Sequence, residues 1–84
     1  MVEGPQIEGD LLAFVRREVF AADAVVTLET DLVSAGFDSL SLVRVLVFVE
    51  QTYGLWIPGN EITGDSLRNL RALAGTVSRL LQGR

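Results

Sequence analysis

The sequence contains no cysteine and no histidine. Without cysteine the chain has no disulfide, no thiol chemistry and no cysteine-ligated zinc site. Without histidine it also lacks the commonest general base and the commonest metal ligand. The short sequence Asp38-Ser39-Leu40 therefore cannot belong to a serine–histidine–acid hydrolase.

Basic residues are scarce in the first part of the chain. Residues 1–38 hold eight acidic residues and two arginines, whereas residues 39–84 hold three acidic residues and five arginines. The first part therefore carries a net charge of −6 and the second part +2. An acidic first half argues against a nucleic-acid-binding surface, which needs a basic stripe, and suits a basic protein partner.

Long hydrophobic runs are also missing. Apolar runs such as Val45–Val49 fall far short of the roughly 20 residues that a membrane span requires. The first residues, MVEGPQIEGD, are acidic and do not resemble a signal peptide. We therefore expect a cytoplasmic protein without a membrane span.

The length of 84 residues allows one domain, residues 1–84, with a core at about 7–82. Its first helix is predicted at about 5–20, where Pro5 suits the first turn. Apolar residues spaced as on one face of a helix define it: Ile7, Leu11, Phe14, Val15 and Val19. The periodicity then fails from Ala21 to Phe37, which predicts a long loop with short β pieces at Val25–Leu28. Loops of this length are usually functional or disordered.

A second helix is expected to begin at Asp38 or Ser39, one of which caps it, and to end near Tyr53 before Gly54. Its predicted core stripe is Leu42, Leu46, Val49 and Tyr53. A short helical turn is expected at Glu61–Thr63. Asp65 or Ser66 is expected to cap a last helix whose inner face carries Leu67, Leu70, Leu73, Ala74, Val77, Leu80 and Leu81. The fold class is an all-α, small four-helix bundle with three main helices, one short third helix and a long first loop.

The second helix has apolar residues around nearly its whole circumference. So small a bundle cannot cover every side of one helix, so we expect Leu40, Val43 and Val47 to be exposed beside Ser39. Exposed apolar patches mark binding sites. The alternative is that the long loop covers these side chains.

The sequence GFDSL at residues 36–40 opens a helix after a long loop and resembles the attachment motif of acyl and peptidyl carrier proteins. The surrounding order is also similar: an amphipathic helix, TDLVSAGFDSL, a helix ending in FVEQTYG, then IP and a final amphipathic helix. This resemblance covers about residues 7–82. The start at Met1 favours a discrete carrier over part of a megasynthase. We expect this carrier to be a monomer.

The resemblance implies that coenzyme A esterifies Ser39 with 4′-phosphopantetheine and releases adenosine bisphosphate. A separate phosphopantetheinyl transferase supplies the catalysis and Mg²⁺, and Asp38 corresponds to an acidic residue that contacts that transferase or its metal. The arm then carries an acyl or aminoacyl group as a thioester between a loading enzyme and a downstream synthase or transferase. Residues expected to dock these partners are Leu40, Val43, Arg44, Val47 and Ile62.

The sequence departs from the carriers of bacterial fatty acid synthesis, whose second helix is strongly acidic. Here that helix carries Glu50 and Arg44 and is net neutral. This favours a secondary-metabolite pathway, making a polyketide, a lipopeptide or a nonribosomal peptide. The sequence leaves open whether the cargo lies between the second and third helices or outside the bundle. It also leaves open a different function, that of a non-catalytic helical interaction domain in which Ser39 is only a helix cap.

Overall fold

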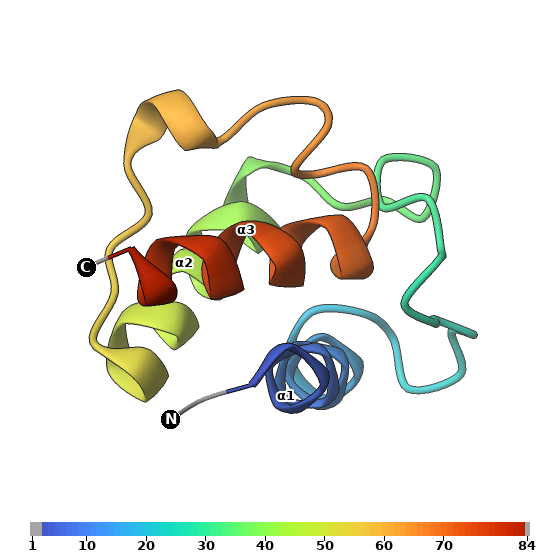
Figure 1. The fold of residues 1–84 in the computed structure, drawn as a ribbon. Helices are drawn as coiled ribbons and strands as arrows, with labels where there is room; N and C mark the ends of the chain where they lie inside the picture. The colour runs from blue at the N-terminus through green and yellow to red at the C-terminus, as the bar shows by residue number, and fades with distance from the viewer. Residues whose placement is uncertain (1–2, 84) are drawn as a thin grey trace.

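The computed structural model describes residues 3–83 and contains three α-helices (Figure 1). These are α1 (Gly4–Glu18), α2 (Ser39–Tyr53) and α3 (Leu70–Gln82), and the 3₁₀ helix η1 (Gly59–Glu61) lies between α2 and α3. The all-α class is confirmed. The predicted count of four helices is not confirmed. In place of the short helix expected at Glu61–Thr63 there is a three-residue 3₁₀ turn that begins two residues earlier. Within residues 3–83 there is no strand, so the β pieces predicted at Val25–Leu28 are wrong.

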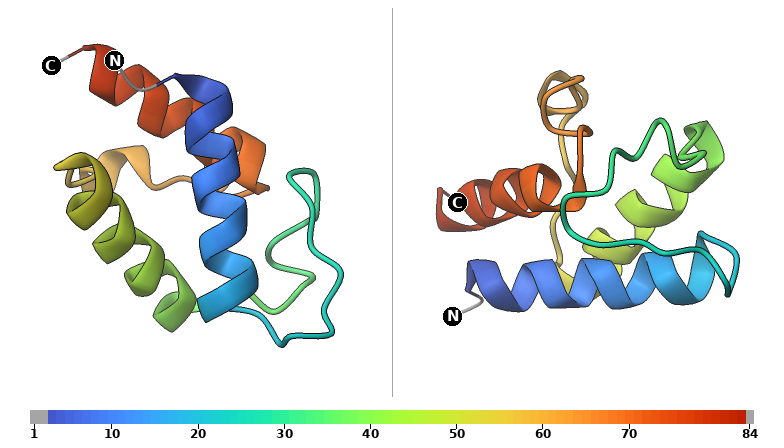
Figure 2. Two further views of the ribbon diagram at one scale, coloured as in Figure 1. Left: turned by 90° about the horizontal axis from the view of Figure 1, so that it is seen from below. Right: turned by 90° about the vertical axis from the view of Figure 1, so that its right-hand side faces the viewer.

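The first helix packs against both others, and the long loop joins its end to the start of α2 (Figure 2). Both views place the first turn of α1 beside the last turns of α3, while the loop leaves the opposite end of α1. This helix ends at Glu18, two residues before the predicted end. None of the helices within the described residues is long and apolar enough to cross a membrane.

The core is formed by apolar residues from all three helices and from both long connections. Its buried members are Ile7, Leu11, Val15, Val26, Leu32, Val45, Leu46, Val49, Tyr53, Leu55, Ile57, Leu70, Leu73, Ala74 and Val77. The predicted stripe of α1 is confirmed at Ile7, Leu11 and Val15, which are buried, and Phe14 and Val19 pack beside them half-buried. The loops therefore contribute to the core and are held by it.

The buried face of α2 is rotated slightly from the predicted stripe. Val45 is fully buried, although the prediction left it outside the stripe, and Leu42 is only half-buried. The ring of Phe48 stacks on Phe14 of α1, with ring centroids 4.4 Å apart. This aromatic contact helps to hold α2 against α1.

The start of α3 lies later than predicted. Asn69 caps it, because its side-chain oxygen accepts a hydrogen bond from the Ala72 amide at 2.8 Å. Ser66 instead belongs to the preceding turn, where its buried hydroxyl donates to the Glu61 carbonyl and accepts from the Thr63 amide, each at 2.8 Å. The predicted cap at Asp65 or Ser66 is therefore wrong. Leu67 precedes the helix and packs half-buried against the core.

A hydrogen bond from the hydroxyl of Tyr53 to Oδ2 of Asp10, 2.7 Å long, joins the end of α2 to α1. Burial of the phenol, followed by the hydrogen bond and the charge of Asp10, raises the pKa of Tyr53 above its ordinary value. The neutral phenol is thus favoured in the folded state. The neutral phenol makes its full contribution to the free energy of unfolding below pH about 10, and this contribution is lost as the pH rises above that value.

We expect Tyr53→Phe to lower the free energy of unfolding at pH 7 by about 1–2 kcal/mol, through loss of this hydrogen bond. The chain has one tyrosine, no lysine and no cysteine, so few other groups titrate near pH 10–11. Urea titrations should show wild-type stability falling over that range while the stability of the variant stays nearly level. Parallel declines in both proteins would contradict the assignment.

Candidate functional site

The side chain of Asp38 caps the N-terminus of α2. Its Oδ1 accepts hydrogen bonds from the Ser41 amide at 2.9 Å and from the Ser41 hydroxyl at 3.0 Å. The first of these contacts has the larger effect, and together they lower the pKa of Asp38 from its ordinary value. The cap is therefore complete near neutral pH and weakens as the pH falls through the pKa of the folded state.

Ser39 is the first residue of α2 and lies next to this cap. Its side chain is exposed, and among residues 3–83 its hydroxyl has no hydrogen-bond partner. The hypothesis that Ser39 caps the helix is therefore wrong, because Asp38 has that role. The hydroxyl of Ser39 remains accessible to another molecule at the positive end of a helix dipole.

The other serines of the chain differ from Ser39 in their environment. Ser41 is half-buried and its hydroxyl is bonded to Asp38, while Ser66 is buried. Ser78 lies on α3, where its hydroxyl accepts a hydrogen bond from Gln82. Ser34 is exposed in the preceding loop. Ser39 is thus distinguished by its place at a helix start, immediately after an acidic residue.

The loop reaches Ser39 through a tight turn. Gly36 has φ 98°, a left-handed conformation that glycine adopts without strain. The Phe37 amide then donates to the Leu32 carbonyl at 2.9 Å, and Leu32 itself is fully buried. These contacts fix the end of the loop immediately before Asp38.

A hollow of about 260 Å³ lies beside Ser39. It is lined by Val33, Phe37, Asp38, Ser39, Leu42 and Leu67. The sequence contains no signal that Val33 or Leu67 belongs to the site, because the two residues lie in different connections. The hollow offers an apolar surface within reach of the Ser39 hydroxyl.

On α2, the side chains of Leu40, Val43 and Val47 are 61%, 52% and 40% exposed. Their predicted exposure is confirmed, so the long loop does not cover them. Val43 and Val47 also line a second hollow of about 360 Å³ between α1 and α2. Its remaining lining residues are Phe14, Glu18, Arg44, Phe48 and Gln51.

Two of the predicted docking residues have contacts within the chain. Arg44 donates from Nη1 to the Glu18 carbonyl at the end of α1, with a distance of 2.9 Å. Ile62 follows η1 and is half-buried against the core, and neither hollow is lined by it. The exposed apolar patch therefore consists of Leu40, Val43 and Val47, with Arg44 at its edge.

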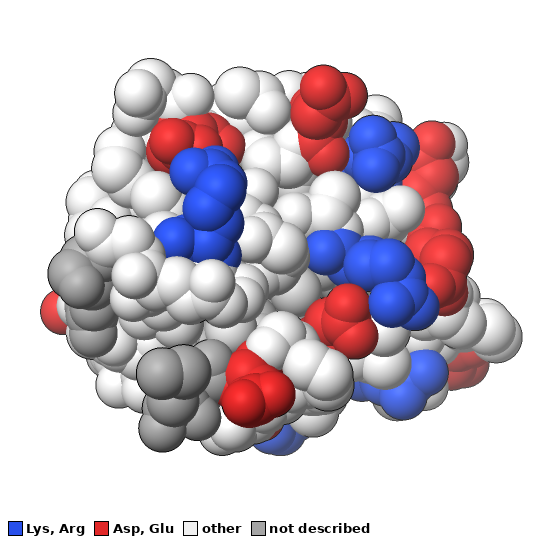
Figure 3. All heavy atoms as spheres, in the orientation of Figure 1, with Lys and Arg blue, Asp and Glu red and all other residues white. Residues whose placement is uncertain are grey.

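Some of the charged side chains form ion pairs with one another within the chain. Figure 3 shows acidic side chains gathered along the edge formed by the long loop, with basic side chains beside them. Arg71 of α3 binds both Glu8 and Glu29, and Arg79 binds Glu61. Arg71 of the second half thus neutralises two acids of the first half, whereas Arg79 and Glu61 both belong to the second half. Asp31 and Asp38 stay exposed.

The family model described as "Phosphopantetheine attachment site" matches residues 10–77 of the chain. This range includes all of α2, both long connections and the N-terminal part of α3. No curated protein matches the chain. Because the family match covers well over half of the sequence, the chain belongs to the phosphopantetheine attachment-site family, whose members carry covalently attached 4′-phosphopantetheine.

Proposed function

We propose that Ser39 is the attachment residue and that the chain, as one domain, is a discrete carrier of acyl or aminoacyl groups. The observation that supports this most strongly is the exposed hydroxyl at the first position of α2, which has no partner among the described residues. It stands directly after Asp38, in a chain whose family carries the prosthetic group.

The surroundings of Ser39 fit an attached phosphate. A phosphodiester on its Oγ would lie at the N-terminus of α2, where the helix dipole and the first-turn amides favour negative charge. The hollow beside Ser39 gives the first part of an arm an apolar surface to contact. Asp38 accepts two hydrogen bonds from Ser41, which stabilise the helix start that a transferase must recognise.

The modification itself is a displacement at phosphorus. The Ser39 Oγ forms the new P–O bond, the diphosphate bond of coenzyme A breaks, adenosine bisphosphate leaves, and the serine proton passes to a base of the transferase. We assign Asp38 the contact with that enzyme or its Mg²⁺. When attached, the group supplies a thiol that holds an acyl or aminoacyl cargo as a thioester.

The partners that this function requires are a phosphopantetheinyl transferase, a loading enzyme and a downstream synthase or transferase. Leu40, Val43 and Val47 form the centre of the proposed docking face, with Arg44 at its edge and Ile62 on the neighbouring connection. Because α2 is nearly uncharged, its partners should present an apolar surface. We therefore favour a secondary-metabolite pathway, with the cytoplasm as its place of action.

We expect Val43→Asp and Val47→Asp each to lower kcat/KM for the transferase by about tenfold or more, because docking would bury an unpaired carboxylate. Arg44→Ala should have a smaller effect, since its guanidinium is bound to α1. Steady-state kinetics with coenzyme A and Mg²⁺ measure both parameters.

Thr52→Asp is the matched control, because Thr52 is exposed on the same helix and does not line the hollow. All variants must keep the wild-type circular dichroism and melting temperature. Unchanged kinetics in the folded Val43→Asp and Val47→Asp variants would refute the proposed docking face.

A helical interaction domain is the alternative, and the exposed patch on α2 is the observation that favours it. Coenzyme A distinguishes the two functions. The carrier should gain the mass of one phosphopantetheine when incubated with coenzyme A, Mg²⁺ and a broad-specificity transferase. An interaction domain should keep its original mass while a control carrier is converted.

A further inference from the structure

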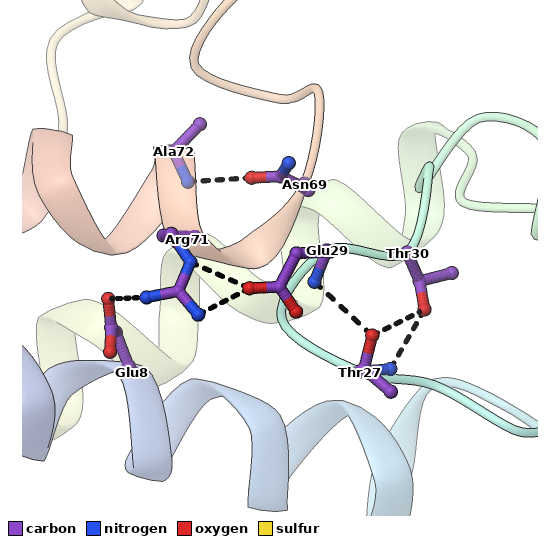
Figure 4. Close-up of polar contacts among 7 residues, drawn as sticks. All are labelled: Glu8, Thr27, Glu29, Thr30, Asn69, Arg71 and Ala72. Atoms are coloured by element: carbon purple, nitrogen blue, oxygen red, sulfur yellow. Dashed lines mark hydrogen bonds and ion pairs between the residues drawn. The ribbon is translucent and has the colours of Figure 1, made fainter.

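One arginine of α3 joins three separate parts of the molecule. The guanidinium of Arg71 lies between Glu8 of α1 and Glu29 of the long loop (Figure 4). Its Nε and Nη2 both bind Oε1 of Glu29, the former at 2.8 Å, and its Nη1 binds Oε2 of Glu8 at 3.2 Å. The hydrogen bonds to Glu29, followed by the charge of Glu29 and then that of Glu8, raise the pKa of Arg71 above its ordinary value.

Backbone hydrogen bonds attach the loop to the same part of α3. The Arg71 amide donates to the Leu28 carbonyl, and the Leu32 amide donates to the Arg68 carbonyl, both at 3.1 Å. These two contacts lie on either side of Glu29 in the sequence. The loop is thus held at the start of α3 by a pair of backbone contacts with an ion pair between them.

The attached segment leads directly to the candidate attachment residue. Leu32 accepts the hydrogen bond from the Phe37 amide, and Asp38 and Ser39 follow immediately. Phe37 also lines the hollow beside Ser39, together with Leu67 from the connection that precedes α3. Movement of the loop away from α3 would therefore change both the approach to Ser39 and the wall of its hollow.

We infer that Arg71 is a positioning residue for the modification of Ser39. This inference rests on the proposed function. It does not touch Ser39. It acts through Glu29 and the backbone of residues 28–37, which it keeps against α3. The loop supplies only Val26 and Leu32 to the buried core, and the helices pack on one another through their own residues, so loss of the ion pair loosens the loop before the helices unfold.

Amide hydrogen exchange, followed by NMR, tests the anchoring directly. In Arg71→Gln and in Glu29→Gln, the amides of Leu32 and Phe37 should exchange about three- to tenfold faster, as expected for loss of an exposed ion-pair network. The amide of Val49 in the core of α2 should keep its rate. Arg71→Lys should rescue only part of the protection, because one ammonium group cannot reproduce the planar fork of arginine.

Arg79→Gln is the matched control. Arg79 lies on the same helix, is similarly exposed and binds one carboxylate, that of Glu61, away from the long loop. Its loss should leave the Leu32 and Phe37 amides unchanged. Equal acceleration at Leu32, Phe37 and Val49 in Arg71→Gln, or no acceleration at the two loop amides, would overturn the inference.

The second readout is the kinetics of the transferase. A loosened loop must be ordered again when the enzyme binds, so Arg71→Gln should raise KM by about three- to tenfold and leave kcat nearly unchanged. Faster exchange at the loop amides with an unaltered KM would overturn the positioning role. A wild-type chain that is not modified at all would refute the proposed function, whereas the exchange rates would still decide whether Arg71 anchors the loop.

Discussion

Ser39→Ala should abolish transfer of phosphopantetheine from coenzyme A to the protein. The substitution removes the only atom of that side chain that can form the phosphodiester, while Asp38, which caps α2, is retained. The wild-type protein should gain the mass of one phosphopantetheine, and fragmentation should place it on Ser39. The variant should keep its original mass after the same incubation.

The fold of Ser39→Ala should be almost unaffected. Because the residue is exposed and does not cap the helix, the free energy of unfolding should change by less than about 0.5 kcal/mol. Ser34→Ala is the matched control, since Ser34 is an exposed serine of the loop that precedes α2 and should not be needed for modification. Modification of Ser39→Ala, or an unmodified wild type beside a fully converted control carrier, would refute the attachment site.

Ser39→Thr examines the same chemistry more finely. Threonine keeps a hydroxyl but adds a β-branch, which restricts the side-chain torsion and the approach of the oxygen to phosphorus. We expect modification to be slow or absent in this variant. Modification at the wild-type rate would mean that the transferase tolerates a branched side chain and that the exposed hydroxyl alone is sufficient.

The start of α2 could be predicted from sequence, whereas the start of α3 could not. Before α2, the two candidate caps Asp38 and Ser39 are adjacent and precede a long apolar run, so either choice places the helix start within one residue. Before α3, three residues can each cap a helix: Asp65, Ser66 and Asn69. The choice depends on contacts with a distant segment, because Arg68 and Arg71 bind the backbone of the long loop and Ser66 closes its own turn. Local propensity contains no information on such contacts.

The candidate site was also only partly predictable, because some of its features depend on contacts between distant residues. Exposure of Leu40, Val43 and Val47 followed from a count of apolar residues that so few helices cannot cover. The hollow between α1 and α2 did not follow, because it depends on the stacking of Phe14 on Phe48, two residues far apart in the sequence. The same pattern of apolar residues does not show that Val45, and not Leu42, is fully buried. A helix that is apolar on nearly every side does not reveal which side its neighbours will cover.

Leu46→Ala should destabilise the fold by about 2–5 kcal/mol, because it removes a core side chain and leaves a cavity among the helices. Leu46 is only 8% exposed and lies in the predicted core stripe of α2. A domain of 84 residues has a small margin of stability, so a large fraction of the variant should be unfolded near physiological temperature. Denaturant titration followed by circular dichroism measures the difference.

Leu40→Ala is the matched control for this substitution, since it removes the same atoms from the same helix at a side chain that is 61% exposed. Its free energy of unfolding should change by less than about 0.5 kcal/mol. The two variants should also differ in function, because Leu40 lies on the proposed docking face and Leu46 does not. Leu40→Ala should keep its stability and bind the transferase more weakly, whereas Leu46→Ala should lose activity only in proportion to its unfolded fraction. A loss of less than about 1 kcal/mol in Leu46→Ala would contradict the assignment of the buried face of α2, since truncation of a buried leucine normally costs more.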